Sequence, residues 1–222
     1  MLRKKDAARA AQAAFIRAAA RNSNRERELL QTDERRPGQE ERIEFEYIRH
    51  GTLCLIASFN VVTGESVPPT VGPTRTEEDF VEHCKRTVML HPKSSWRLIM
   101  DQLNTHGSES LVRWVVAMEE LKLSADELGV KGKSGILKSL ATRKEFLSSP
   151  DRRLRFIYVP KHSSWLNQVE IWFSVVVRRV LQRGNFTSLN ALRQRLLEFI
   201  DYFNRTMAKP YRWTYTGQPL KI

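Results

Sequence analysis

The stretch RFIYVPKHSSWLNQVEIWFSVVVRRV, residues 155–180, joins an apolar run to a strongly apolar helix through a polar loop. The pattern predicts a buried strand over residues 154–160 and a helix over about 167–183. One acid, Glu170, stands near the start of that helix, with no basic residue three or four positions further along. A carboxylate just after a buried strand, among arginines and aromatics, makes Glu170 the first candidate functional residue.

A second acid stands in a similar position after another strand. WRLIMD, residues 96–101, is typical of a short buried strand and ends on Asp101. In α/β folds, sites form where the C-terminal ends of neighbouring strands meet. Two carboxylates there repel each other unless a cation neutralises them, and Mg²⁺ is bound by a few carboxylates together with waters and phosphate oxygens. Asp101 and Glu170 therefore predict metal-dependent phosphodiester chemistry.

Both acids also have a purely structural interpretation. Asn167-Gln168-Val169-Glu170 has the spacing of a capping box, in which Glu170 returns a hydrogen bond to the helix start. Asp101 fits equally well into an Asx turn. Four polar residues near the two acids are candidates for supporting contacts around the site, although a polar side chain beside a strand end is often simply structural: Asn104, His106, His162 and Asn167.

The chain is strongly basic, and its charge is unevenly distributed. Its 222 residues carry 37 Lys and Arg against 25 acids, a net charge of +12, which favours a polyanionic partner such as nucleic acid. Residues 131–222 contain 18 basic and 5 acidic residues, whereas residues 45–130 contain 8 and 12. A DNA-binding face is therefore expected in the C-terminal part, with these candidate contacts: Lys131, Lys133, Lys161, Arg178, Arg179 and Arg183.

The order of the patterns predicts a mixed α/β domain with a central sheet flanked by helices. Residues 1–44 are polar and alanine-rich and are interpreted as a helical lead-in and linker before one domain over residues 45–222. Within that domain we expect a hairpin from residue 52, helices at 74–90, 108–121 and 188–207, and a Lys-rich insertion at about 120–153 that behaves as a flap rather than as core.

Two further properties concern the compartment. The two cysteines form no disulfide framework and have no metal-ligand spacing, which favours a reducing compartment. No apolar stretch approaches 18 residues, so we expect no membrane span. The predicted location is cytoplasmic and, with a DNA partner, nucleoid-associated.

Several motifs in chain order resemble the bacterial insertion-sequence transposases of the IS-six-thirty type, in the mariner-like superfamily. They run from about Arg36 to Leu220 and include FEYIRHGTLCLIASFNVVTGE, GPTRTEEDFVEH, MDQLNTH, GVKGKSGILKS, VPKHSSWLNQVEIWFSVVVRRVLQRGNF and KPYRWTYTGQPL. The resemblance implies an RNase H-like fold whose DDE triad binds two Mg²⁺ ions, with Mn²⁺ as a substitute. It also implies an enzyme that acts on double-stranded DNA as a homodimer, cutting at transposon ends and joining the freed 3′-hydroxyl to a target. By the same resemblance, residues 1–44 would hold a remnant of the family's N-terminal DNA-binding region.

The resemblance maps the triad onto this chain residue by residue. Asp101 in MDQLNTH matches the second acid and Glu170 in WLNQVE matches the third. Asp33, in Thr32-Asp33-Glu34, is the candidate for the first acid, although RPGQ follows it more closely than in the family. The main alternative is an inactive remnant that binds DNA or dimerises without cleaving. A third interpretation is an RNase H-like nuclease with no role in transposition.

Overall fold

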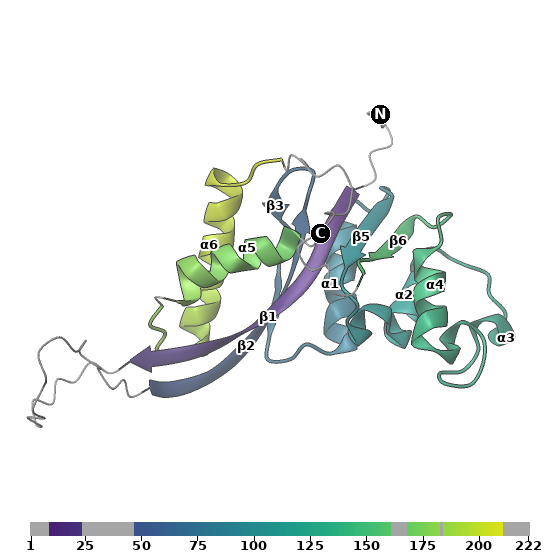
Figure 1. Cartoon of the computed structure of the whole chain (residues 1–222), viewed down its shortest axis with the longest axis horizontal. Helices are drawn as coiled ribbons and strands as arrows, with labels where there is room; N and C mark the ends of the chain where they lie inside the picture. The colour runs from purple at the N-terminus through teal and green to yellow at the C-terminus, as the bar shows by residue number, and fades with distance from the viewer. Residues whose placement is uncertain (1–8, 24–46, 161–167, 183, 211–222) are drawn as a thin grey trace, which may run out of the picture.

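The computed structural model describes residues 9–23, 47–160, 168–182 and 184–210, with side chains from His50 onward (Figure 1). Its elements are β1 (Arg9–Ser23), β2 (Tyr47–Asn60), β3 (Glu65–Ser66), β4 (Thr70–Gly72), α1 (Glu77–Met89), β5 (Trp96–Met100), η1 (Asn104–Gly107), α2 (Glu109–Met118), α3 (Ala125–Leu128), η2 (Ile136–Lys138), α4 (Leu140–Ser148), β6 (Leu154–Tyr158), α5 (Gln168–Val176), η4 (Val177–Leu181) and α6 (Leu189–Thr206).

The strands form one mixed sheet in the order β3-β2-β1-β5-β6, with β4 also paired to β2. β2 runs antiparallel to β1, β3 and β4, whereas β1, β5 and β6 are parallel to one another. An antiparallel hairpin followed by parallel crossovers, with helices on the sheet, is the RNase H-like arrangement. The predicted fold class is confirmed.

The alanine-rich N-terminal segment was the least expected part of this sheet. Residues 9–23 form the strand β1 and not the helix that the sequence predicts for the lead-in. Alanine favours helices and is depleted in strands, so pairing with β2 on one side and β5 on the other overrides local preference here. The boundary predicted at residue 44 lies outside the described residues and stays a prediction.

Alternation along β2 divides the interior into two cores. Leu53, Leu55, Ala57 and Phe59 point to one face of the sheet and pack with the apolar residues of α5 and α6. Ile56 points to the other face, where it joins a cluster built from α1, α2, β5 and β6. In Figure 1, α5 and α6 lie together at one end of the molecule, and α2, α3 and α4 lie at the other.

The hairpin and the first helix form as their local signals predict. Gly64 has a φ of +79° and donates its N–H to the Asn60 carbonyl across the turn, at 2.7 Å. Thr76 and Asp79 form the expected capping box at the start of α1. The predicted helices at 108–121 and 188–207 and the predicted strands at 96–101 and 154–160 are confirmed, apart from small shifts at their ends. β2 begins earlier than residue 52, and the helix predicted over 167–183 changes to a π-helix at Val177.

The Lys-rich insertion is more deeply buried than a flap. It contains η2 and α4, and the side chains of Leu137 and Leu147 are both 0% exposed within the core cluster of β5 and β6. The interpretation of residues 120–153 as lying outside the core is therefore wrong. The segment is mostly polar, but Leu137 and Leu147 are apolar and pack the segment against the sheet.

Among the described residues, no helix is both long enough and apolar enough to cross a membrane. Cys54 and Cys84 are both buried and unpaired, so neither forms a disulfide.

Candidate functional site

Asp101 lies immediately after β5 with its side chain 44% exposed. Its Oδ1 accepts a hydrogen bond from the Leu103 backbone N–H at 3.0 Å and lies 2.7 Å from Nδ1 of His106. The first contact is the Asx turn that the structural interpretation predicts. That turn leaves much of the carboxylate open to solvent, so the structural and the functional interpretations are compatible.

His106 supports Asp101 from inside the protein. Its side chain is 1% exposed, and its ring packs on Phe80 with ring centroids 4.4 Å apart. Both ring nitrogens are buried and neither makes a hydrogen bond of good geometry among the described residues, although Nδ1 lies 2.7 Å from Asp101. Because the ring is fixed by packing, it keeps this close contact with the carboxylate on the inner side of Asp101. Asn104, by contrast, is exposed at the start of η1.

Helix α4 brings a lysine to the same edge of the sheet. Lys144 Nζ donates to Oε1 of Gln102 at 2.7 Å and lies 4.7 Å from the centre of the Tyr158 ring. The Tyr158 hydroxyl in turn donates to the His106 carbonyl at 2.7 Å. A β-carbon at Gly107 would collide with the side chains of α4, so the glycine allows this close approach.

These neighbours keep Asp101 ionised. Burial by itself would raise the pKa of the carboxyl group, but the contact with His106, the Leu103 N–H and the electrostatic effects of His106 and Lys144 outweigh it. The net result is a pKa below the ordinary aspartate value. Asp101 therefore carries a negatively charged carboxylate at neutral pH.

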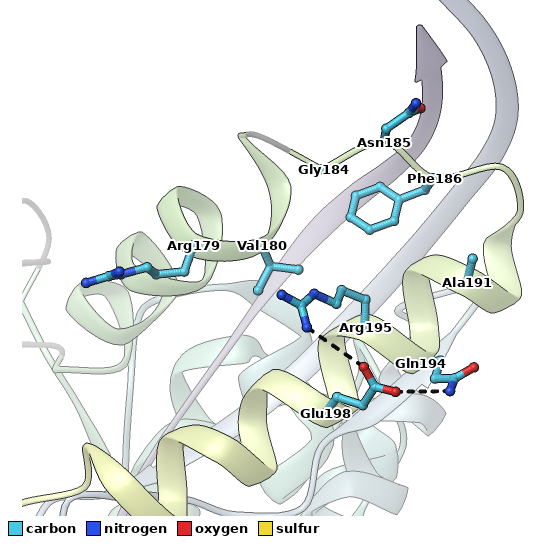
Figure 2. Close-up of a pocket in the computed structure, with 9 residues that line it drawn as sticks. All are labelled: Arg179, Val180, Gly184, Asn185, Phe186, Ala191, Gln194, Arg195 and Glu198. Carbon is cyan, nitrogen blue, oxygen red and sulfur yellow. Dashed lines mark hydrogen bonds and ion pairs between the residues drawn. The ribbon is translucent and has the colours of Figure 1, made fainter.

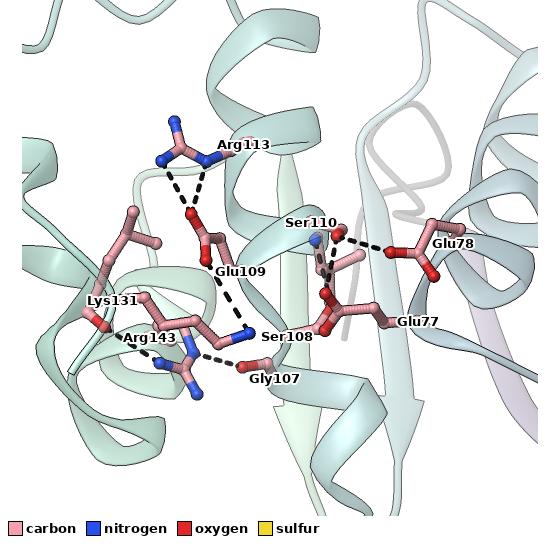
Figure 3. Close-up of polar contacts among 11 residues, drawn as sticks. Glu77, Glu78, Gly107, Ser108, Glu109, Ser110, Arg113, Lys131 and Arg143 are labelled. Carbon is pink, nitrogen blue, oxygen red and sulfur yellow. Dashed lines mark hydrogen bonds and ion pairs between the residues drawn. The ribbon is translucent and has the colours of Figure 1, made fainter.

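The insertion is fixed to this edge by further polar contacts (Figure 3). Arg143 donates through Nε to the Gly107 carbonyl at 2.7 Å and through Nη1 to the Leu137 carbonyl at 3.0 Å. Glu109 lies 2.7 Å from Nη2 of Arg113 and 3.8 Å from Nζ of Lys131. Lys131 and Lys133 are exposed on the loop before η2, but the charge of Lys131 is partly compensated by that acid.

Glu170 lies in the first turn of α5 and is partly buried. The hydroxyl of Ser174 donates to its backbone carbonyl at 3.0 Å. Helix α5 packs across β1 and β2, and Val169 next to Glu170 is fully buried there. Residues 161–167 lie outside the described residues, so the capping box of Glu170 and the roles predicted for Lys161, His162 and Asn167 stay predictions.

The strand beside Asp101 supplies no acid. Gln12 of β1 is level with Ile99 of β5, and continuing this parallel register places Ala14 level with Asp101. The β1 sequence, RAAQAAFIRAAARNS, contains no Asp or Glu. Asp33 lies outside the described residues.

The carboxylates that are described do not fit a pair of divalent ions. Within the described part of the chain, no group of three His, Cys, Asp or Glu side chains could hold a metal. Two ions in working geometry need more carboxylate ligands than Asp101 and Glu170 supply. A third ligand would have to come from residues outside this part.

The RNase H-like sheet with an ionised aspartate after β5 defines the fold class and one candidate site residue, and the family is established by comparison. The family profile of the DDE superfamily endonucleases matches residues 22–193, well over half of the chain, and the chain belongs to this family. No curated protein matches it. Among solved structures, the chain is similar to the mariner Mos1 paired end complex with Mg, with 13% sequence identity and a TM-score of 0.33. The match covers 92% of this chain but only 57% of that chain.

Three residues at the Asp101 edge are absent from the sequence-based site: Gln102, Lys144 and Tyr158. Lys144 was missed because its helix lies within the segment interpreted as a flap. The available signal was Ser139 followed three residues later by Thr142, which starts α4 through side-chain capping. With that helix recognised, Lys144 and the buried Leu147 lie three residues apart, about one turn.

Proposed function

We propose that the chain is the catalytic domain of a DNA transposase, acting on phosphodiester bonds at the ends of an insertion sequence. The observation that carries the proposal is Asp101: an ionised, partly exposed carboxylate at the C-terminal end of β5, in a chain of the DDE endonuclease family. The basic C-terminal part supports a DNA partner.

In this proposal Asp101 and Glu170 are two carboxylates of the triad, and a divalent ion would be Mg²⁺ or Mn²⁺. His106 and the Leu103 N–H orient Asp101, and the ammonium of Lys144 adds positive charge where a phosphate would approach. Because the described acids do not fit two ions, metal-dependent cleavage requires a further ligand, for which Asp33 is the candidate.

A second candidate function is DNA binding without cleavage. The specific observation in its favour is the sequence of β1, which has no acid at the position level with Asp101. Such a protein would keep the basic surface but lack the first member of the triad. The homodimer and the nucleoid-associated location remain predictions under either candidate.

Nicking of supercoiled plasmid in the presence of Mn²⁺ separates the two candidates, because Mn²⁺ tolerates imperfect ligand geometry better than Mg²⁺. The parent protein is compared with Glu170→Gln and Asp33→Asn. Glu145→Gln, an exposed acid on α4, is the matched control. For a working transposase domain, both triad substitutions abolish nicking and the control retains it.

Each other outcome has a definite meaning. Nicking lost in Glu170→Gln but retained in Asp33→Asn would exclude Asp33 as the third ligand. A parent that binds DNA but never nicks it, at any metal concentration, establishes the second candidate. A parent that does not bind DNA overturns both.

A further inference from the structure

We propose that a groove between η4 and α6 binds a backbone phosphate of duplex DNA at a distance from Asp101; this rests on the proposed DNA partner. The groove has a volume of about 420 Å³ (Figure 2). Val180 and Phe186, both nearly fully buried, form its apolar floor. Four of its lining residues have side chains that can donate hydrogen bonds: Arg179, Asn185, Gln194 and Arg195. In Figure 2 the Arg179 guanidinium points away from Arg195, and it can turn towards an anion because the side chain is exposed.

The charge around the groove favours an anion. Residues 171–197 contain five arginines and no acid. The groove's one acid, Glu198, accepts a hydrogen bond from Gln194 at 3.0 Å and lies 3.9 Å from Nη1 of Arg195. Arg179 has no ion pair among the described residues. Glu198 therefore compensates one guanidinium in part, and the groove keeps a positive charge.

The backbone around the groove has two unusual features. The chain from Val177 to Leu181 is a π-helix, a rare conformation that is frequently found at functional sites. A β-carbon at Gly184 would collide with the ring of Phe186 and with the Val180 carbonyl. The glycine therefore allows the loop to pack directly on Phe186, and Phe186 remains buried beneath the polar side chains of the groove.

The chemistry of these side chains indicates a phosphate and not a stacked base. Guanidinium groups recognise phosphate oxygens through paired hydrogen bonds, and the side-chain amides of Asn185 and Gln194 can donate to the same kind of oxygen. Phe186 is only 7% exposed, so its ring offers no open platform for a base.

The sheet register gives the separation between the groove and Asp101. Ala14 is level with Asp101 when the register of β1 and β5 is continued, and Ala20 pairs with Gly51 of β2. The side chain of Leu189, at the start of α6, packs over Gly51. Six residues of strand span roughly 20 Å. Measured along the strands alone, the start of α6 beside the groove is therefore about six nucleotides of duplex DNA away from Asp101, because duplex DNA rises about 3.4 Å per nucleotide.

The test measures binding of a fluorescent 30-base-pair duplex by anisotropy over a range of salt concentrations. The variant is Arg179→Gln with Arg195→Gln, and both side chains are exposed, so folding is expected to be retained and is checked by circular dichroism. The matched control is Arg205→Gln, which lies on α6 like Arg195 but outside the groove. Arg205 forms an ion pair with Asp201 at 2.9 Å. The double variant should bind roughly tenfold more weakly at about 0.1 M salt, and its salt slope should fall by about one, because one phosphate contact is lost.

The control should change the dissociation constant less than about twofold, because Asp201 already compensates its charge. Hydrogen exchange of the parent should show that DNA slows exchange over residues 184–191. A double variant that binds like the control, with the parent's salt slope, overturns the groove and leaves the proposed function intact. A parent that shows no salt-dependent binding at all overturns both.

Discussion

The two sides of the sheet differ in how they treat charge. On the side of α1, α2 and α4, polar groups are buried and paired within the protein: His83 with Ser58, and His106 with Asp101. On the side of α5 and α6 the core is almost entirely apolar, and the arginines stay outside it. On the first side, buried polar groups contact one another and stabilise the fold. On the second side, the arginines are exposed and can bind an anion from outside the protein.

The largest effect that tests this contrast comes from the insertion. Leu147→Ala should lower the free energy of unfolding by about 2–5 kcal/mol, because a fully buried side chain is replaced by a cavity. Urea denaturation measures the loss. Val130→Ala, at a site 55% exposed in the same insertion, should change it by less than about 0.5 kcal/mol. If both substitutions changed the free energy of unfolding by the same small amount, the insertion would be a flap outside the core.

Acid sensitivity should come from the first side. Burial, and then the charge of Arg86, lower the pKa of His83 to about 3, from an ordinary value of 6.5. Below pH 6.5 the unfolded chain takes up a proton here that the folded protein does not, so stability is present above pH 6.5 and is lost as the pH falls towards 3.

Melting temperatures measured from pH 7 to pH 4 test this. The parent should lose stability over this range, and His83→Gln should lose less over the same range, whatever its stability at pH 7. Identical slopes for the two proteins would show that other groups cause the acid sensitivity.

A smaller effect is expected at Lys144. Lys144→Gln removes the charged hydrogen bond to Gln102 and should cost about 1 kcal/mol of unfolding free energy. The pKa of Asp101, followed by carboxyl NMR, should rise in the variant because a neighbouring positive charge is lost. An unchanged Asp101 titration would show that α4 does not influence the candidate site.

The smallest effect is expected on the exposed surface of α2. Arg113 pairs with Glu109 one turn earlier, and both reach solvent, so Arg113→Ala should cost no more than about 0.5 kcal/mol. A thermal melt is sufficient to measure it. A loss of more than about 1 kcal/mol would mean that Glu109 organises the insertion through Lys131 and Arg113 together.

The sequence was informative where local chemistry decides the structure. Asp101 was identified because it ends an apolar strand, and α1 because Thr76 and Asp79 form its cap. β1 was missed because alanines form a strand there only through partners distant in the chain. Lys144 was missed for the same kind of reason: its place beside Asp101 depends on how α4 folds back onto η1, which no local pattern records.

The central position of β1 has a consequence for how the protein is made. Among the described strands, β1 alone connects β2 to β5, and Arg9 pairs with Trp96. Because β1 is synthesised well before β5, the sheet cannot close until β5 has been made, and such long-range parallel pairing forms slowly. Until then the two halves of the sheet remain separate, with the inner edges of both exposed to aggregation.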